Sequence, residues 1–440
     1  MEYDYIIIGA GISGLYTAYL IKKHKANCKI LILEANNYIG GRMGTDNFYS
    51  SKILTGAGIG RKKQDINLIN LLKELKINYN EFTVNHNYAS DIVKVDINKI
   101  MDELKDYYDK DKDKKPVNFK TFATLVLGEQ LYKNFLINSG YRDYENEDAY
   151  SVLTDYHMEY NTGKWTGLYI PWDDLINRLV DIINSKNIKL NSTVTNINYL
   201  DKEVYVSNKK YYFKKIILAT TIKPIQKLLK LPLYKQIKSQ SFLRIYAKIN
   251  TNYIDIMKEK VSINVAEDHN NKLLKVPTTL VVSSLLYKII PINSDKGIYM
   301  IAYSDNKGAD KLNREIDNKV YFETLLAKSI NINNNTIKID KMKHYYWKEG
   351  THYFLPYKHM ISCKSERLEL SNKNKSICKI NPKIKILNHN YKLDFIKKAQ
   401  NPKENVYVVG ECISTYQGWV EGAISSVNNI IQSILENNII

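Results

Sequence analysis

Residues 3–14 read YDYIIIGAGISG, and this stretch decides the fold of the chain. Its first half is a short apolar run that ends at a glycine, which is typical of a fully buried parallel strand. A helical pattern follows from about Ser13 to Lys25, and the next apolar run, KILILE at 29–34, predicts a second buried strand. Together the segments predict a strand–helix–strand unit of about 30 residues.

Three glycines, Gly9, Gly11 and Gly14, lie at the turn between this strand and its helix. In this pattern the first glycine makes the tight turn, the second lets the backbone approach a pyrophosphate, and the third lets helix and strand pack closely. Glu34 comes 20 residues after Gly14, at the end of the second strand, where its carboxylate can bond ribose hydroxyls. The unit therefore predicts that the chain binds a dinucleotide.

Two further glycine-containing stretches have patterns that can bind an anionic group. Gly40-Gly41-Arg42 follows just beyond Glu34, and Arg42 can neutralise pyrophosphate charge, with an ordinary surface turn as the alternative. Near the other end of the chain, VVGE at 408–411 ends a strand, and GWVEGA at 418–423 opens a helix. The N–H groups of that helix terminus can face the anionic edge of a ring, although a plain strand–helix junction has the same pattern.

The order of the elements predicts an α/β fold. We expect a Rossmann-type dinucleotide-binding domain that is interrupted by insertions, which form a mixed α+β substrate domain. We expect single helices at 313–329 and 422–436 and strands at 241–250, 279–286 and 298–303. The expected domains are 1–79 plus 164–240 plus 388–440 for the dinucleotide, and 80–163 plus 241–387 for the substrate.

Composition narrows the classes of partner. The chain has 440 residues, 44% of them hydrophobic, and 64 Lys and Arg against 46 Asp and Glu give a net charge of +18. Only seven of the 64 cations are Arg, and the lysines are spread along the chain, so we do not expect sequence-specific binding to nucleic acid. The four cysteines lie far apart, which excludes a zinc ribbon, and we expect no metal site.

The sequence shows neither a secretory leader nor an apolar run long enough for a transmembrane segment. We therefore expect a soluble, cytoplasmic protein, or a virion protein if the source is a virus. A homodimer is an open alternative to a monomer.

The motifs GAGISGL, GGRM, GAGIG at 56–60, VVGE and GWVEGAISS resemble, in order and spacing, those of the flavin-containing amine oxidases, which include monoamine, polyamine and L-amino acid oxidases. The resemblance implies a bound FAD, held noncovalently, because Thr351 stands nearest the position where some relatives attach the flavin to a cysteine. The cofactor-binding residues that it implies are Gly9, Gly11, Ile12, Ser13, Gly14, Glu34, Ala35, Gly41, Arg42, Gly58, Ile59, Val194, Gly410, Glu411, Trp419, Val420 and Ala423.

The resemblance also indicates catalytic positions. Arg244 stands where monoamine and polyamine oxidases place a lysine that acts through a water near the flavin, and Lys248 is the alternative on the same strand. Arginine does not lose its proton in proteins, so Arg244 can orient water or O2 but cannot accept a proton. In these oxidases two aromatic side chains form the walls before the flavin, and the candidates here are Trp419, Trp347, His352 and Tyr353, with packing in a core as the alternative.

Arg61 resembles the arginine with which L-amino acid oxidases bind the substrate carboxylate, and a solvent-facing arginine is the alternative. The implied reaction is oxidation of a C–N bond, with hydride transfer from the α-carbon to flavin N5, and with O2 as acceptor giving H2O2. The substrate is then a small amine or, if Arg61 anchors a carboxylate, an amino acid. The alternative of another class is a catalytically weak FAD-binding scaffold or particle protein.

Overall fold

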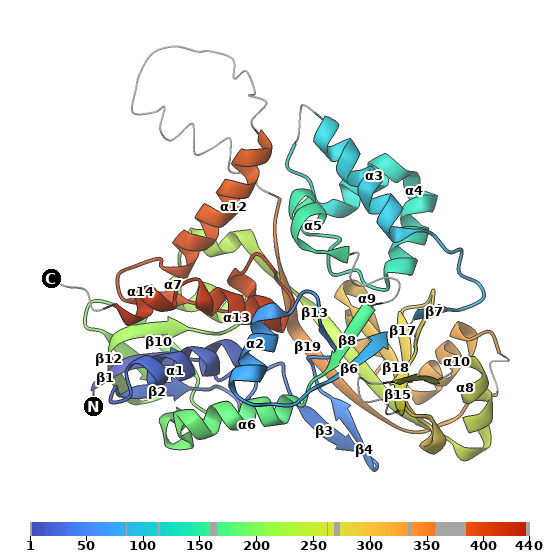
Figure 1. Ribbon diagram of the computed structural model, residues 1–440, viewed down its shortest axis with the longest axis horizontal. Helices are drawn as coiled ribbons and strands as arrows, with labels where there is room; N and C mark the ends of the chain where they lie inside the picture. Colours follow the sequence, from blue (N-terminus) through green and yellow to red (C-terminus); the bar gives the residue numbers. More distant parts are fainter. Residues whose placement is uncertain are drawn as a thin grey trace.

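Two β-sheets lie side by side in the computed structural model, one in the left half of Figure 1 and one in the right half. A group of helices lies above the second sheet. The structure describes residues 2–84, 86–111, 115–158, 165–261, 263–267, 273–332, 336–356 and 384–436.

The first sheet has seven strands in the order β10-β11-β12-β1-β2-β9, with β20 also paired to β12. Its strands are β1 (Glu2–Ile8), β2 (Ile30–Leu33), β9 (Ile188–Lys189), β10 (Val194–Asn198), β11 (Glu203–Val206), β12 (Lys209–Leu218) and β20 (Val406–Val408). The strands β1, β2, β9, β12 and β20 are paired in parallel, and β10 and β11 add an antiparallel edge. A parallel sheet must be covered on both faces, which explains why β1 and β2 are near-continuous apolar runs.

Helices cover both faces of this sheet. Alternate residues of β1 point to opposite faces, so Tyr5 and Ile7 belong to one core and Ile6 and Ile8 to the other. The first core is completed by α1 (Ile12–His24), α2 (Ile66–Glu74), α6 (Trp172–Ile183), α13 (Val420–Asn428) and α14 (Ile431–Leu435). The second core is completed by α7 (Ile222–Leu229) and α12 (Ile384–Gln400).

The second sheet has six strands in the order β19-β13-β18-β17-β16-β7. Its strands are β7 (His86–Tyr88), β13 (Ile237–Ile249), β16 (Thr279–Val281), β17 (Lys288–Asn293), β18 (Ile298–Asp305) and β19 (Ile339–Phe354). The helices α8 (Ile254–Lys260), α9 (Asn306–Arg314) and α10 (Lys319–Ser329) pack with this sheet in a separate core. Smaller sheets are formed by β3 (Thr45–Phe48) with β4 (Ser51–Leu54), by β5 (Gly60–Arg61) with β8 (Trp165–Tyr169) and β6 (Asn80–Val84), and by β14 (Ile263–Glu267) with β15 (Leu273–Pro277).

The antiparallel pair β13–β19 joins the two halves of the molecule. Ile237 and Phe354, at one end of the pair, lie in a core of the first sheet, whereas Ile249 and Ile339, at the other end, lie in the core of the second. One ribbon thus contributes to both cores, and Figure 1 shows β13 and β19 running between the two sheets. A cavity is lined by residues along the pair, such as Gln240, Arg244 and Gly350.

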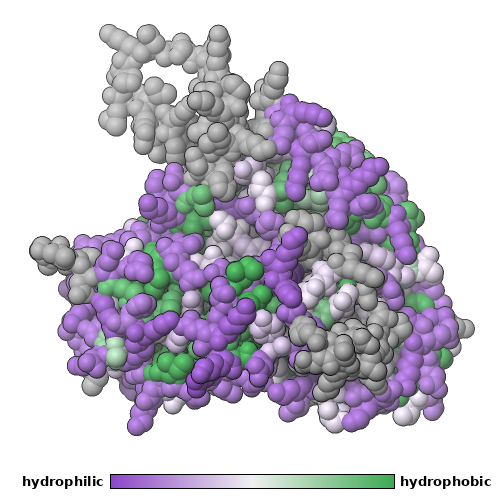
Figure 2. Space-filling view, in the orientation of Figure 1, coloured by the Kyte–Doolittle hydropathy of each residue, from purple (hydrophilic) through white to green (hydrophobic). Residues whose placement is uncertain are grey.

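The helices α3 (Ile97–Lys110), α4 (Phe119–Ser139) and α5 (Ala149–Asp155) have an apolar core of their own. Each begins at a polar residue whose side chain accepts backbone N–H groups: Asp96 before α3, Asn118 before α4 and Asp148 before α5. Among the described residues we find no helix with the length and hydropathy of a membrane span. Figure 2 shows a face on which hydrophilic side chains predominate.

The expected α/β fold with a Rossmann-type domain is confirmed, while three element boundaries were wrong. The helix expected at 313–329 is two helices, α9 and α10, because the Asn318 side chain caps a new start by accepting from the Tyr321 N–H at 3.1 Å. The helix expected at 422–436 is α13 and α14, interrupted after Asn428. The strand expected at 279–286 ends at Val281 because a turn, closed by the Tyr287 N–H on the Ser284 carbonyl, precedes β17.

The strand β19 (Ile339–Phe354) was not predicted from the sequence. The division into two domains stays a prediction, and β13 crosses its boundary at residue 240.

Candidate active site

A cavity of about 1120 Å³ is lined by residues of both sheets and of the loops between them. That volume lies just above the range of about 300–1,000 Å³ that small-molecule pockets span. Of the site residues that the sequence predicted, all line this cavity except Gly14, Tyr353 and Lys248, the alternative to Arg244. The fold therefore brings together residues that are separated by more than 400 positions in the chain, from Gly9 to Ala423.

The glycine turn at one end of the cavity is shaped for close approach of a ligand. Gly9 has φ +107°, and a Cβ there would lie 2.4 Å from the Ala219 carbonyl oxygen, while a Cβ at Gly14 would lie 2.0 Å from the Gly9 carbonyl oxygen. A Cβ at Gly11, in contrast, would have no atom of the described residues within 4 Å. Gly11 is also the N-cap of α1 and carries no capping side chain. An open, uncapped helix N-terminus fits the pyrophosphate of a dinucleotide.

Glu34 lies beside this turn, as the motif predicted. Its carboxylate is buried and accepts hydrogen bonds from the Ala10 N–H at 2.7 Å and the Asn36 N–H at 2.8 Å. These bonds fix the carboxylate in the cavity wall at the end of β2, which is where a ribose would lie. Val194 lines the same end from β10.

Arg42 connects the two halves of the site. Its Nη1 donates to the Gly350 carbonyl of β19 at 2.8 Å and to Glu411 Oε1 at 2.5 Å. Burial opposes the charge of Glu411, but His352 and Arg42 more than offset it, so the pKa of this carboxyl lies well below its ordinary value. Glu411 is therefore an anion that orients the arginine and also accepts from the Gly418 N–H at 2.9 Å.

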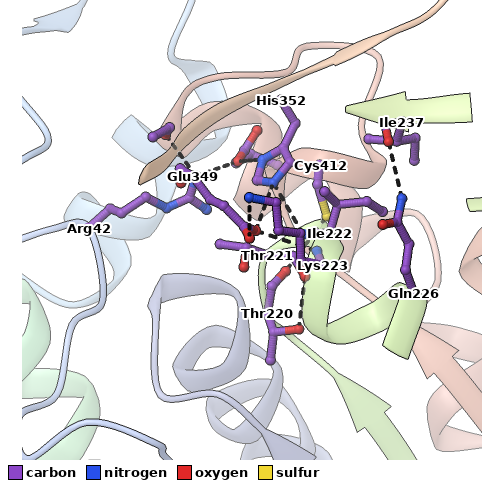
Figure 3. Close-up of polar contacts among 12 residues, drawn as sticks. Arg42, Thr220, Thr221, Ile222, Lys223, Gln226, Ile237, Glu349, His352 and Cys412 are labelled. Atoms are coloured by element: carbon purple, nitrogen blue, oxygen red, sulfur yellow. Dashed lines mark hydrogen bonds and ion pairs between the residues drawn. The ribbon is translucent and has the colours of Figure 1, made fainter. Parts of the chain in front are cut away.

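His352 belongs to this polar network (Figure 3). Its Nδ1 bonds Glu411, and its Nε2 accepts from the Ile222 N–H at 3.2 Å. Burial alone would lower the pKa of His352, but Glu411 and Glu349 raise it above its ordinary value. Glu349, whose pKa is about 2 because His352 and Thr221 outweigh its burial, completes the network. Both ring nitrogens of His352 are thus occupied by the protein, which places it as a support for Glu411 more than as an aromatic wall.

The aromatic residues at the other end of the cavity are held by hydrogen bonds. Trp419 Nε1 donates to Asp65 Oδ2 at 2.9 Å, and Trp347 Nε1 donates to the Thr55 carbonyl at 2.8 Å. Burial raises the pKa of Asp65 to about 6 although Arg61 opposes the shift. These bonds fix two indole rings in the cavity wall.

Arg61 lies among these rings. Its guanidinium carbon is 5.4 Å from the Trp419 ring centroid and 5.9 Å from the Trp165 ring centroid, and its Nη1 donates to the Tyr416 hydroxyl at 3.3 Å. Burial disfavours the charge, but Tyr416 and Asp65 outweigh it and raise the pKa of Arg61. Arg61 is therefore a charged group that lines the cavity, as the carboxylate-anchor hypothesis requires, and the alternative of a solvent-facing side chain was wrong.

Arg244 and Lys248, the two candidates on β13, lie in different places. The Arg244 guanidinium is buried in the cavity wall, 4.6 Å from the Tyr303 ring centroid, and a Cβ on Gly58 would lie 3.0 Å from its Nη2. Lys248 lies outside the cavity lining and donates to the Ile249 carbonyl at 2.8 Å.

Several residues of this end of the cavity were not identified from the sequence, namely Tyr141, Lys288 and Tyr303. One of them had a visible signal, because Lys288 interrupts the apolar run LLYKIIPI at 285–292. A lysine within such a run must find a buried environment for its amine, which makes it a candidate for function.

Comparisons with known proteins give the family of the chain. A family model described as flavin-containing amine oxidoreductase matches residues 113–427, and one described as an NAD(P)-binding Rossmann-like domain matches residues 7–75. The chain belongs to the flavin-containing amine oxidoreductases. The family resemblance that the motifs indicated is thereby confirmed, and with it the expectation of a flavin cofactor.

The similar solved structures show the same fold. A putrescine oxidase bound to putrescine is 14% identical, with 99% of each chain covered and a TM-score of 0.69. Cyclohexylamine oxidase from Brevibacterium oxydans IH-35A is 15% identical, with 99% of each chain covered and a TM-score of 0.68. Among curated proteins, uncharacterized protein R188 of Acanthamoeba polyphaga mimivirus is 34% identical over 79 residues, which is 18% of this chain and only 16% of that protein.

Proposed function

We propose that this protein is an FAD-dependent amine oxidase that oxidises the C–N bond of a small amine. The observation that carries the proposal is that one cavity contains both the glycine turn of β1 and α1 and an aromatic wall with Arg61 and Arg244. When bound, the flavin would accept a hydride from the α-carbon of the amine and pass the electrons to O2, giving H2O2. We propose that the FAD is held noncovalently.

Residues at different places in the cavity would bind different parts of the cofactor and the substrate. Gly11 and the N-terminus of α1 would hold the pyrophosphate, and Glu34 the adenosine ribose. Arg42, fixed by Glu411, would neutralise negative charge between the two ends of the cofactor. Trp419 and Trp347 would form apolar walls that orient the substrate and exclude water.

The similar solved structures support a small amine as the substrate. Two of them carry the names of amine oxidases, and one of these is bound to putrescine. Asp143, Glu147 and Asp155 line the cavity, but these carboxyls supply little net negative charge. Burial raises the pKa of Asp143 and raises that of Glu147 to about 8, and Asp155 forms an ion pair with Lys392. An amine that enters as an ammonium ion must lose a proton before its α-carbon can give up a hydride, and a desolvated site favours that loss.

Arg61 supports a second candidate, an oxidase of L-amino acids. Its guanidinium lies in the cavity wall beside Trp419, and a planar fork of donors suits a carboxylate. The test is to compare amines with the matching L-amino acids on the parent and on Arg61→Lys, which keeps the charge but loses the fork. The amino-acid candidate requires a selective loss of amino-acid turnover, and equal effects on both substrate classes would contradict it.

The visible spectrum of the purified protein, followed by anaerobic addition of candidate amines, tests the proposed function. We expect flavin absorbance that is released on denaturation, as for a noncovalent cofactor, and that bleaches when the right amine is added. A colourless protein that does not take up FAD would contradict the proposal. Bound flavin with no bleaching and no peroxide across a broad amine panel would favour a catalytically weak FAD-binding scaffold.

A further inference from the structure

Lys288 lies in the same cavity as Arg244, the residue that stands at the position of the family's lysine. Lys288 begins β17, is 3% exposed, and lines the cavity. Its Nζ is 3.2 Å from the ring centroid of Tyr141, so the amine rests on the face of that ring. The same Nζ is 5.5 Å from the ring centroid of Tyr303, the ring on which Arg244 also lies. The amine of Lys288 and the guanidinium of Arg244 therefore reach one tyrosine from two strands.

The Lys288 amine makes no ion pair within the part of the chain that the structure describes. The charged groups that act on it are the guanidinium groups of Arg61 on β5 and Arg244 on β13, and the carboxyls of Asp305 on β18 and Asp143 in the loop before α5. The two arginines remain charged at any working pH. Burial raises the pKa of both Asp143 and Asp305, so these carboxyls offer Lys288 less negative charge than their number suggests.

These surroundings disfavour a positive charge on Lys288, which would be a third cation beside Arg61 and Arg244. Burial lowers the pKa of Lys288 well below its ordinary value, and the arginines add to this against the two carboxyls. Contact with the faces of Tyr141 and Tyr303 partly favours the charged form, but each such contact contributes only about 0.5–2 kcal/mol. A lysine that is neutral and faces a substrate cavity is able to accept a proton, which neither arginine can do.

We propose that Lys288 is the proton acceptor of this site, which takes the proton that a substrate ammonium loses on binding. In this step an N–H bond of the ammonium breaks, its electron pair stays on the substrate nitrogen, and the proton bonds to the lone pair of Lys288 Nζ. The charge moves from substrate to protein, no electrons are exchanged, and the substrate is left as a neutral amine. The proposal rests on the proposed function, since it assumes that an amine enters this cavity.

Calorimetric proton counting on the FAD-bound protein tests the proposal without turnover. The probe is 2-phenylpropan-2-amine, whose α-carbon has no hydrogen and which therefore cannot be oxidised. Its binding is measured near pH 7.5 in buffers that differ in ionisation enthalpy, which gives the number of protons released. If Lys288 takes the proton, the parent releases about none to the buffer. Lys288→Met, which keeps the length of the side chain, releases about one and binds about tenfold tighter for each pH unit gained.

Lys296→Met is the matched control, because Lys296 is an exposed lysine just beyond β17 that donates to Ser50 Oγ at 2.6 Å. Binding of the amine to this variant should release as few protons to the buffer as binding to the parent does. Equal proton release by the parent and Lys288→Met, or release of a full proton by the parent, overturns the proposal.

If Lys288→Met does not fold, the dependence of the parent's amine affinity on pH tests the proposal. Its affinity for the amine should be level while Lys288 is neutral and fall about tenfold per pH unit once Lys288 is protonated. A profile that is level over the whole range in which the protein is folded overturns the proposal. None of these readouts depends on substrate oxidation, so a protein that binds FAD and amine but does not turn over leaves the test of Lys288 intact.

Discussion

The two ends of the cavity are built in different ways. The dinucleotide end is formed largely by backbone, at Gly9, Gly11 and the N-terminus of α1, with one carboxylate, Glu34, beside it. The other end is formed by side chains that converge from separate strands, such as Arg244 from β13 and Lys288 from β17. A short motif suffices for the first end, because local geometry makes it. The second end exists only once the two sheets have packed together.

The largest effect is expected at the dinucleotide end of the cavity, where substitutions of two glycines should have different consequences. Gly14→Ala would place a Cβ 2.0 Å from the Gly9 carbonyl oxygen, so we expect a loss of more than about 4 kcal/mol in the free energy of unfolding. Gly11→Ala has room for its methyl group and extended backbone, so the fold should persist. That methyl group would point into the space of the pyrophosphate and weaken FAD binding by roughly 10- to 100-fold.

Thermal unfolding of the apoprotein and titration with FAD measure the two effects. The pair is informative because each variant is the control of the other. If Gly11→Ala bound FAD as tightly as the parent does, the cofactor would not approach the turn, and the assignment of this end of the cavity would be wrong.

The substrate end should show an effect on rate and a smaller one on cofactor binding. Arg244→Met removes a charge that is buried on the Tyr303 ring, so we expect flavin reduction by an amine to slow by roughly tenfold or more, with the flavin spectrum retained. Stopped-flow reduction under anaerobic conditions measures this. Arg314→Met, at an exposed arginine of α9 that donates to the Asp310 carbonyl, is the control and should change the rate less than about twofold. Parallel loss of FAD binding would instead place Arg244 at the cofactor.

The contrast between the two ends also explains what the sequence could predict. The strand–helix–strand unit, Glu34 and Arg42 followed from the glycine spacing, and Glu411 and Trp419 from the family resemblance, because local motifs carry these positions. Lys288 and Tyr303 could not be assigned in the same way, since their proximity depends on the order of β13, β18 and β17 in the second sheet. No local pattern encodes which strands become neighbours.

His352 is another case in which the sequence was insufficient. From the sequence it was an aromatic residue near the expected flavin ring. In the structure its ring contacts are with Glu411 and the Ile222 N–H, and this pairing depends on the meeting of β19 with the strand end at 411 and the start of α7. The same limit applies to helices such as α9 and α10, where one capping asparagine ended a pattern that otherwise continued.

A smaller effect on stability than that of Gly14→Ala is expected from Glu147 in the cavity wall. Burial raises the pKa of Glu147 to about 8, against an ordinary value of 4.5, so the folded protein holds this proton more tightly than the unfolded chain does. The resulting stability is complete below about pH 4.5 and is lost as the pH rises through 8. Glu147→Gln does not titrate, so it should be more stable than the parent by roughly 4 kcal/mol at pH 8.5 and about equal at pH 4.

Chemical unfolding at the two pH values measures this difference. Glu103→Gln, at an exposed position of α3, is the control and should show no comparable difference. A Glu147→Gln variant with the same stability gain at both pH values would mean that packing, not protonation, distinguishes it from the parent.

The smallest effect is expected from the exposed lysines that lie outside the cavity, which contribute much of the net charge of +18. Lys214 bonds Asp4 at 2.8 Å with 61% of its side chain exposed, and such pairs contribute little because water and salt screen them. We expect Lys214→Ala to shift the melting temperature by less than about 2 °C and to leave FAD and amine affinity unchanged at 0.1 M salt, where the Debye length is about 10 Å. A change in either affinity that disappears at 1 M salt would show that the surface charge acts on the cavity over a distance. The arginines of the wall, Arg61 and Arg244, would then no longer suffice to describe its electrostatics.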